Sequence, residues 1–134
     1  MSPRILIVDD EVALRRTLER ALRAMGWEVV SAGDAHLAYQ VLDETDVDLV
    51  LLDLHLPLMG GDTFFLALAR RWPRLATRIV LMTGDTFAEQ DHWPAELRRI
   101  PLLLKPFTLE LLRRTVTAAL EGPASEGRAS NGPA

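Results

Sequence analysis

The 134-residue chain is 49% hydrophobic and 25% charged, a balance typical of one globular domain with a substantial core. It contains no cysteine, which excludes disulfides and thiolate chemistry and fits a reducing cytoplasm, the location we expect for it. The net charge of −4 argues against nucleic acid as the main partner, and no apolar run is long enough to cross a membrane.

Short apolar runs alternate with stretches of helical periodicity along the whole chain. The runs predict buried strands at residues 4–8, 28–31, 49–53, 78–83 and 102–104. The periodic stretches predict helices at residues 12–25, after residue 34, at 62–72 and at 109–120. This alternation is typical of an α/β fold, in which a doubly wound parallel sheet carries helices on both faces.

Local signals mark where the helices begin and end. Gly26 is expected to stop the first helix, Asp34 to cap the second and Pro73 to end the third. Thr108 should cap the last helix, with Glu110 near the positive end of its dipole.

Two segments depart from this regular alternation. Pro94 interrupts any helix between residues 84 and 101, so we expect a short helix at residues 95–99, with residues 85–93 mobile or irregular. Residues 122–134 consist mainly of Gly, Pro, Ala and Ser, have no apolar surface to bury, and predict a disordered tail. The folded domain should therefore cover residues 3–121.

Polar residues stand at the exits of four apolar strands. Asp9 and Asp10 follow the first strand, Asp53 ends the third, Thr83 ends the fourth, and Lys105 follows the last. In parallel sheets ligands bind beyond the carboxyl ends of the strands, so these side chains should gather around one point. Two like charges about 4 Å apart repel by on the order of 4 kcal/mol at an effective dielectric constant near 20. A divalent cation removes that repulsion, and oxygen ligands favour a hard one such as Mg²⁺.

Each of these residues also has a structural interpretation. An acidic pair after a strand suits the N-terminus of the next helix, Asp53 could belong to a turn, and Thr83 could satisfy backbone groups. Lys105 could be solvated. The alignment of all five with strand ends favours the functional interpretation.

The arginines of the first helix are interpreted as part of a solvated helix face. Glu11–Arg15 and Glu19–Arg23 have the i,i+4 spacing of helical ion pairs, which argues against a nucleic-acid patch.

Four motifs resemble those of receiver domains of two-component response regulators. They are IVDDE at residues 7–11, LLDLHLPLMGG at 51–61, MTGD at 82–85 and LKPF at 104–107. Their order and spacing match the family, the likeness covers residues 3–121, and it is closest in character to receivers associated with hybrid histidine kinases. The resemblance implies a flavodoxin-like, five-stranded sheet with the strand order 2-1-3-4-5.

The resemblance also implies roles for individual residues. Asp53 would accept the phosphoryl group, and Thr83 and Lys105 would contact its oxygens. The ligands of a Mg²⁺ ion would be Asp9 (largely through water), Asp10, Asp53 and the backbone carbonyl of His55. The Lys105–Pro106 bond is expected to be cis, since X–Pro bonds favour trans by only about 0.5–1 kcal/mol.

The function implied is that of a signalling module and not of an enzyme acting on other substrates. The partner would be a histidine kinase or a histidine phosphotransfer domain, with output by protein contact or phosphate relay, since no DNA-binding motif follows residue 121. We expect a monomer or weak dimer. Leu102 departs from the family, in which many members carry Tyr or Phe at that position.

Two rival functions stay open at this point. One is a Mg²⁺-dependent phosphatase or phosphotransferase with an aspartyl nucleophile, although haloacid-dehalogenase-type enzymes have their two acids two residues apart on the first strand. The other is a degenerate receiver that acts only as a binding module, for which Leu102 argues weakly. A nucleotide-binding enzyme is excluded because Asp9, Asp10 and Glu11 stand where phosphate-binding glycines would be needed.

Overall fold

The protein is built around one sheet of five parallel strands. A computed structural model describes residues 2–56, 59–84 and 87–126. The strands are β1 (Arg4–Val8), β2 (Glu28–Ala32), β3 (Leu49–Asp53), β4 (Ile79–Thr83) and β5 (Leu102–Leu104). They lie in the order β2-β1-β3-β4-β5, and all four neighbouring pairs are parallel. The predicted fold class and strand order are therefore confirmed.

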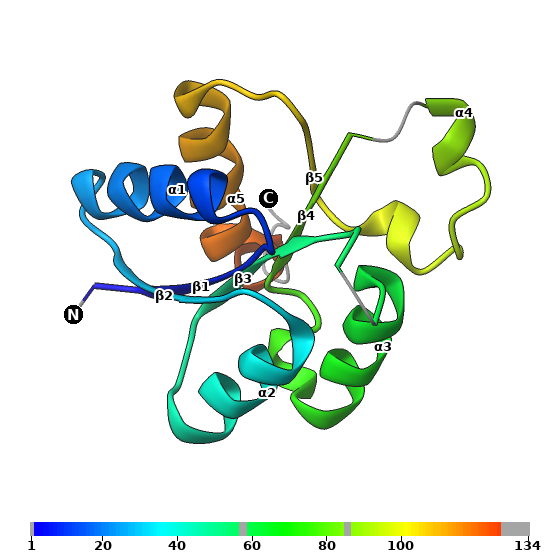
Figure 1. Cartoon of the computed structure of the whole chain (residues 1–134), viewed down its shortest axis with the longest axis horizontal. Coiled ribbons are helices and arrows are strands. Elements are labelled where there is room, and N and C mark those ends of the chain that lie inside the picture. Colours follow the sequence, from blue (N-terminus) through cyan, green and yellow to red (C-terminus); the bar gives the residue numbers. More distant parts are fainter. Residues whose placement is uncertain (1, 57–58, 85–86, 127–134) are drawn as a thin grey trace.

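Helices cover both faces of the sheet (Figure 1). One face carries α1 (Val12–Ala24) and α5 (Leu109–Glu126), and the other carries α2 (Ala35–Glu44) and α3 (Gly61–Arg71). Short 3-10 turns occur at η1 (Pro73–Leu75) and η2 (Leu97–Arg99), and a single-turn helix, α4 (Phe87–Gln90), stands apart from the sheet. Among the described residues no helix is long and apolar enough to span a membrane.

The strands separate two hydrophobic cores. Ile5 and Ile7 of β1 pack in the core with α1 and α5, whereas Leu6 and Val8 pack in the core with α2 and α3. Successive side chains of a strand point to opposite faces, so a strand covered on both faces must be apolar at every position. This is why β1, β3 and β4, the three inner strands, read as nearly continuous apolar runs in the sequence.

The predicted helix signals act as expected. Gly26 has φ of +101°, a left-handed conformation that ends α1 and favours glycine. The Asp34 carboxylate accepts a hydrogen bond of 2.8 Å from the N–H of Leu37 at the start of α2. The Thr108 hydroxyl accepts one of 3.0 Å from the N–H of Leu111 at the start of α5.

The prediction for the fourth helix is confirmed after Pro94 and wrong before it. The residues after Pro94 form the short 3-10 helix η2 within the predicted range 95–99, whereas residues 87–90, expected to be mobile or irregular, form the α-helical turn α4. The N–H of Leu97 donates to the Pro94 carbonyl at 3.0 Å, and that of Arg98 donates to the Ala95 carbonyl at 3.2 Å. These i to i+3 bonds define a 3-10 turn, which suits a piece too short to close an α-helix. Residues 85 and 86 lie outside the described part of the chain.

The last helix is longer than predicted. It continues to Glu126, beyond the domain boundary expected at residue 121, so residues 122–126 are helical and not tail. Extending an existing helix avoids the nucleation cost that a new one would meet, which composition alone does not reveal. The rest of the predicted tail, residues 127–134, lies outside the described residues.

Candidate active site

Three aspartates meet at the carboxyl ends of β1 and β3. Ligand oxygens of Asp9, Asp10 and Asp53 all lie within 4.8 Å of one another. Asp9 is 0% exposed and Asp53 is 5% exposed, while the Asp10 side chain is open to solvent. Three carboxylates this close form a hard, all-oxygen donor set that suits Mg²⁺. The exposed Asp10 leaves one side of this set open, as a cation that keeps several waters requires.

Asp9 is held at its backbone and at both carboxylate oxygens. Its N–H donates to the Ala32 carbonyl at 3.1 Å. Its Oδ1 accepts the N–H of Glu11 at 2.8 Å, and its Oδ2 accepts the Lys105 ammonium at 3.2 Å. A buried carboxylate needs such partners, because an isolated charge in the interior is very unfavourable. Because both of its carboxylate oxygens accept hydrogen bonds, the Asp9 side chain is held in one orientation.

Lys105 bridges the first and third strands. Its Nζ lies 3.2 Å from Asp9 Oδ2 and 3.6 Å from Asp53 Oδ2. Its backbone N–H donates to the Thr83 carbonyl at 2.7 Å, and Thr83 is 0% exposed. The Lys105–Pro106 peptide bond is cis, as predicted. The ammonium is therefore the cation nearest to Asp53 among the ion pairs of the described residues.

Asp53 has a shifted proton affinity. Burial raises the pKa of Asp53 above its ordinary value of 3.8. The N–H of His55, which donates to Asp53 Oδ1 at 3.0 Å, and the Lys105 ammonium both lower this pKa. The negative charges of Asp9 and Asp10 raise it again, and the net pKa is raised. Any cation that enters the site would therefore stabilise the ionised form of Asp53.

Close packing at Gly61 holds the start of α3 against the end of β3. The N–H of Gly61, at the start of α3, donates to the Leu54 carbonyl at 2.8 Å. A Cβ atom at this position would lie 2.5 Å from the Asp53 carbonyl oxygen and 2.5 Å from the Leu54 Cα. Both neighbours are backbone atoms, so no side-chain rotation could relieve the overlap. Helix α3 therefore rests directly on the end of the strand that carries Asp53.

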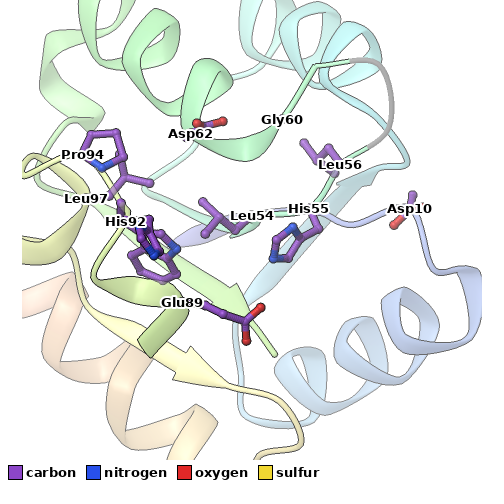
Figure 2. Close-up of a pocket in the computed structure, with 11 residues that line it drawn as sticks. Asp10, Leu54, His55, Leu56, Gly60, Asp62, Glu89, His92, Pro94 and Leu97 are labelled. Atoms are coloured by element: carbon purple, nitrogen blue, oxygen red, sulfur yellow. The ribbon is translucent and has the colours of Figure 1, made fainter. Parts of the chain in front are cut away.

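A pocket of about 510 Å³ opens beside Asp10 (Figure 2). Its floor is apolar and its rim carries acids and two histidines. The lining residues are Asp10, Leu54, His55, Leu56, Gly60, Asp62, Glu89, His92, Trp93, Pro94 and Leu97. His55 and His92 are both exposed to solvent where they line this pocket.

The structure brings all five predicted strand-end residues to one edge of the sheet. It also shows a contact that the sequence did not reveal. Arg15, assigned to a solvated face, donates from Nη1 to the Asp9 carbonyl at 2.7 Å. The sequence suggested an i,i+4 ion pair between Arg15 and Glu11 instead. The hydrogen bond to Asp9 depends on how the chain turns between β1 and α1, which the sequence pattern does not show.

The fold and site together define a class, the small flavodoxin-like domains that carry an acidic cluster at the carboxyl edge of a parallel sheet. The family model that matches is the response regulator receiver domain, over residues 5–117. The chain belongs to this family of signalling domains of two-component systems.

Individual relatives agree with this assignment. The chain is 32% identical over 117 residues to the sensor histidine kinase RcsC of Escherichia coli, covering 87% of this chain and 12% of that kinase. It is 29% identical over 116 residues to the probable chemotaxis protein CheY of Rhizobium etli, covering 86% of this chain and 90% of that protein. The chain thus spans only a small part of the kinase.

Among solved structures, the chain resembles the receiver domain of sensor histidine kinase PA1611 from Pseudomonas aeruginosa PAO1. The TM-score is 0.78 at 21% identity, covering 91% of this chain and 100% of that one. That structure has a magnesium ion coordinated in its active site cleft. At this identity the likeness concerns the fold.

Proposed function

We propose that this chain accepts a phosphoryl group from a phosphohistidine onto Asp53 and passes the signal on by protein contact or phosphate relay. The observation that carries the proposal is the placement of Asp53. Its carboxylate lies at the end of β3, 3.6 Å from the Lys105 ammonium and within the cluster formed with Asp9 and Asp10.

The proposed reaction needs little chemistry from the protein beyond position and charge. An Asp53 oxygen attacks phosphorus, the phosphorus–nitrogen bond of the phosphohistidine breaks, and the imidazole leaves as it takes up a proton. Lys105 is close enough to pair with a phosphoryl oxygen as a compact point charge. Thr83, at the end of β4, supplies a hydroxyl for another oxygen.

The proposed cofactor is Mg²⁺, which would neutralise charge on the phosphoryl oxygens. Asp10 and Asp53 would bind it directly, Asp9 would act largely through water, and the His55 carbonyl would add a further ligand. The mutual closeness of the three carboxylates supports this donor set. The magnesium ion in the PA1611 receiver domain supports it by analogy of fold.

The proposed partner is a histidine kinase or a histidine phosphotransfer domain in the cytoplasm, and the protein would work as a monomer or weak dimer. The match to the kinase RcsC supports a kinase-linked role. The functional unit would be the domain of residues 3–121, together with residues 122–126, which continue α5.

Phosphorylation of the acceptor gives a direct test. Wild-type protein incubated with Mg²⁺ and acetyl phosphate should gain the mass of one phosphoryl group, measured on the intact protein and lost again in mild alkali. Asp53→Asn should abolish the gain. Asp62→Asn is the matched control, because Asp62 lines the same pocket but is outside the three-aspartate cluster, and it should label normally. Full labelling of Asp53→Asn would overturn the assignment.

A further inference from the structure

The peptide bond between Asp9 and Asp10, the two acidic residues that follow β1, is held by an arginine. Arg15 Nη1 donates to the carbonyl oxygen of Asp9 at 2.7 Å. A peptide group is planar, so a hydrogen bond to its oxygen restrains the whole plane, including the nitrogen and Cα of Asp10. The direction in which the Asp10 side chain leaves the backbone is thereby restrained as well.

The same guanidinium lies against the turn between β2 and α2. A Cβ atom at Gly33 would be 3.2 Å from Arg15 Nη1, closer than most Cβ contacts in proteins, and in ordinary contact with its Cζ at 3.7 Å. Glycine at this position therefore leaves room for the arginine. The turn is itself anchored, because Asp34 caps α2 and the N–H of Asp9 donates to the carbonyl of Ala32.

We propose that Arg15 is a positioning residue for the metal centre: it holds the Asp9–Asp10 peptide so that the Asp10 carboxylate faces Asp53 and a divalent cation. The inference rests on the proposed function, since it presumes that the three aspartates bind Mg²⁺. Arg15 would act through the backbone and not by touching the cation or the phosphoryl group.

The arginine could influence a bound cation in two opposite ways. As a nearby positive charge it would repel Mg²⁺, so its removal would tighten binding. As a hydrogen-bond donor to the Asp9 carbonyl it would favour the arrangement that binds Mg²⁺, so its removal would weaken binding. The sign of the change in affinity therefore separates a positioning role from a simple charge effect.

Helix α1 provides a matched control in Arg23. Arg23 Nη2 also donates to a strand carbonyl, that of Val29, at 3.3 Å. It is on the last turn of α1, whereas the aspartates lie beside the first turn. Replacing Arg23 removes the same charge and the same type of bond without touching the site.

The test is the dissociation constant for Mg²⁺, measured from backbone amide chemical shifts at constant ionic strength. The proteins compared are wild type, Arg15→Gln, Arg15→Lys, Gly33→Ala and Arg23→Gln. Both Arg15 variants should bind Mg²⁺ about tenfold more weakly, a loss typical of residues that orient metal ligands. Gly33→Ala, which displaces the guanidinium but keeps its charge, should also weaken binding, by less. Arg23→Gln should bind as wild type does.

Several results would overturn the inference. If Arg15→Gln binds Mg²⁺ more tightly and Arg15→Lys binds it as wild type does, Arg15 acts only through its charge. Unchanged affinity in both variants would show that Arg15 has no influence on Mg²⁺ binding. Should Arg15→Gln fail to fold, Gly33→Ala decides, and unchanged affinity there counts against positioning. Failure of the wild-type protein to bind Mg²⁺ would instead contradict the proposed function.

Discussion

At the scale of single residues, Asp53 combines a functional position with a cost in stability. Burial raises the pKa of Asp53 above its ordinary value of 3.8, so the folded state holds the proton more tightly than the unfolded state does. The stabilisation linked to this proton is full below pH 3.8 and is lost as pH rises through the folded-state pKa. At neutral pH the ionised Asp53 therefore opposes folding when no metal is bound.

Asp53→Asn should consequently raise the melting temperature of the metal-free protein at neutral pH. The substitution removes the charge and nearly conserves shape. The gain should shrink as pH falls toward the ordinary pKa of 3.8, because wild-type Asp53 then becomes neutral as well. Thermal unfolding in EDTA over that pH range checks this, with Asp62→Asn as the control. A lower melting temperature for Asp53→Asn at neutral pH would contradict the expectation.

The sequence predicted which side chains meet where their position at the end of a strand was enough to bring them together. Asp53, Thr83 and Lys105 are at strand ends, and parallel strands bring their carboxyl ends to one edge. It could not predict the hydrogen bond from Arg15 to the Asp9 carbonyl, because that contact depends on the angle at which α1 crosses the sheet. Local spacing favoured a pairing between Arg15 and Glu11 instead.

At the scale of elements, the contact between α3 and the end of β3 depends on one glycine. Gly61→Ala should destabilise the protein by about 3 kcal/mol, because the new Cβ meets rigid backbone and forces the strand end and the helix apart. Gly60→Ala is the matched control. There the Cβ would meet only the end of the Asp62 side chain, which can rotate away, so the cost should be below about 1 kcal/mol.

Urea unfolding of both variants measures these costs. Equal losses for the two glycine variants would show that the close contact at Gly61 does not carry the difference. Because the contact involves the Asp53 carbonyl, Gly61→Ala should also slow labelling by acetyl phosphate, whereas Gly60→Ala should not.

The elements that the sequence predicted well are those with a strong apolar period. The five strands and the helices α1, α2 and α3 agree with their predicted ranges to within a residue or two at each predicted end. The segment around Pro94 lacks such a period. Its shape is set by tertiary contacts, including burial of Leu97 and hydrogen bonds from Arg98 to the carbonyls of Asp91 and Trp93. The sequence pattern could therefore show that Pro94 interrupts a helix, but not that an α-helical turn forms before it.

At the scale of the whole molecule, metal binding should be visible as stability. Mg²⁺ that binds only the folded protein stabilises it by RT ln(1 + [Mg²⁺]/Kd), about 1.4 kcal/mol at ten times Kd. For a domain of this size that is a rise in melting temperature of about 5 °C. Thermal unfolding with MgCl₂, against NaCl at matched ionic strength, measures it. Asp10→Asn should lose most of the increase, and an equal rise in that variant would place the ion elsewhere.

The arrangement of α4 also predicts how the molecule associates. A stable interface buries roughly 800 Å² on each partner, with about 20–30 residues a side. Helix α4 has a single turn, and the half-buried Leu102 on β5 has neither the ring nor the hydroxyl that many family members carry there. We therefore expect that phosphorylation does not create a dimer through this part of the surface, and that output uses another one, such as α1.

Sedimentation velocity on the protein with and without acetyl phosphate and Mg²⁺ tests this expectation. The sedimentation coefficient should stay that of a monomer in both states, and Asp53→Asn controls for effects of the reagents. Hydrogen exchange measured on the same samples locates any contact. Exchange at the amides of residues 87–93 should remain fast, because one helical turn gives little protection to its own N–H groups. A phosphorylation-dependent dimer with new protection across residues 87–99 would show that the short helix is a sufficient interface after all. Dimerisation without protection there would place the interface on another face and leave the argument about α4 intact.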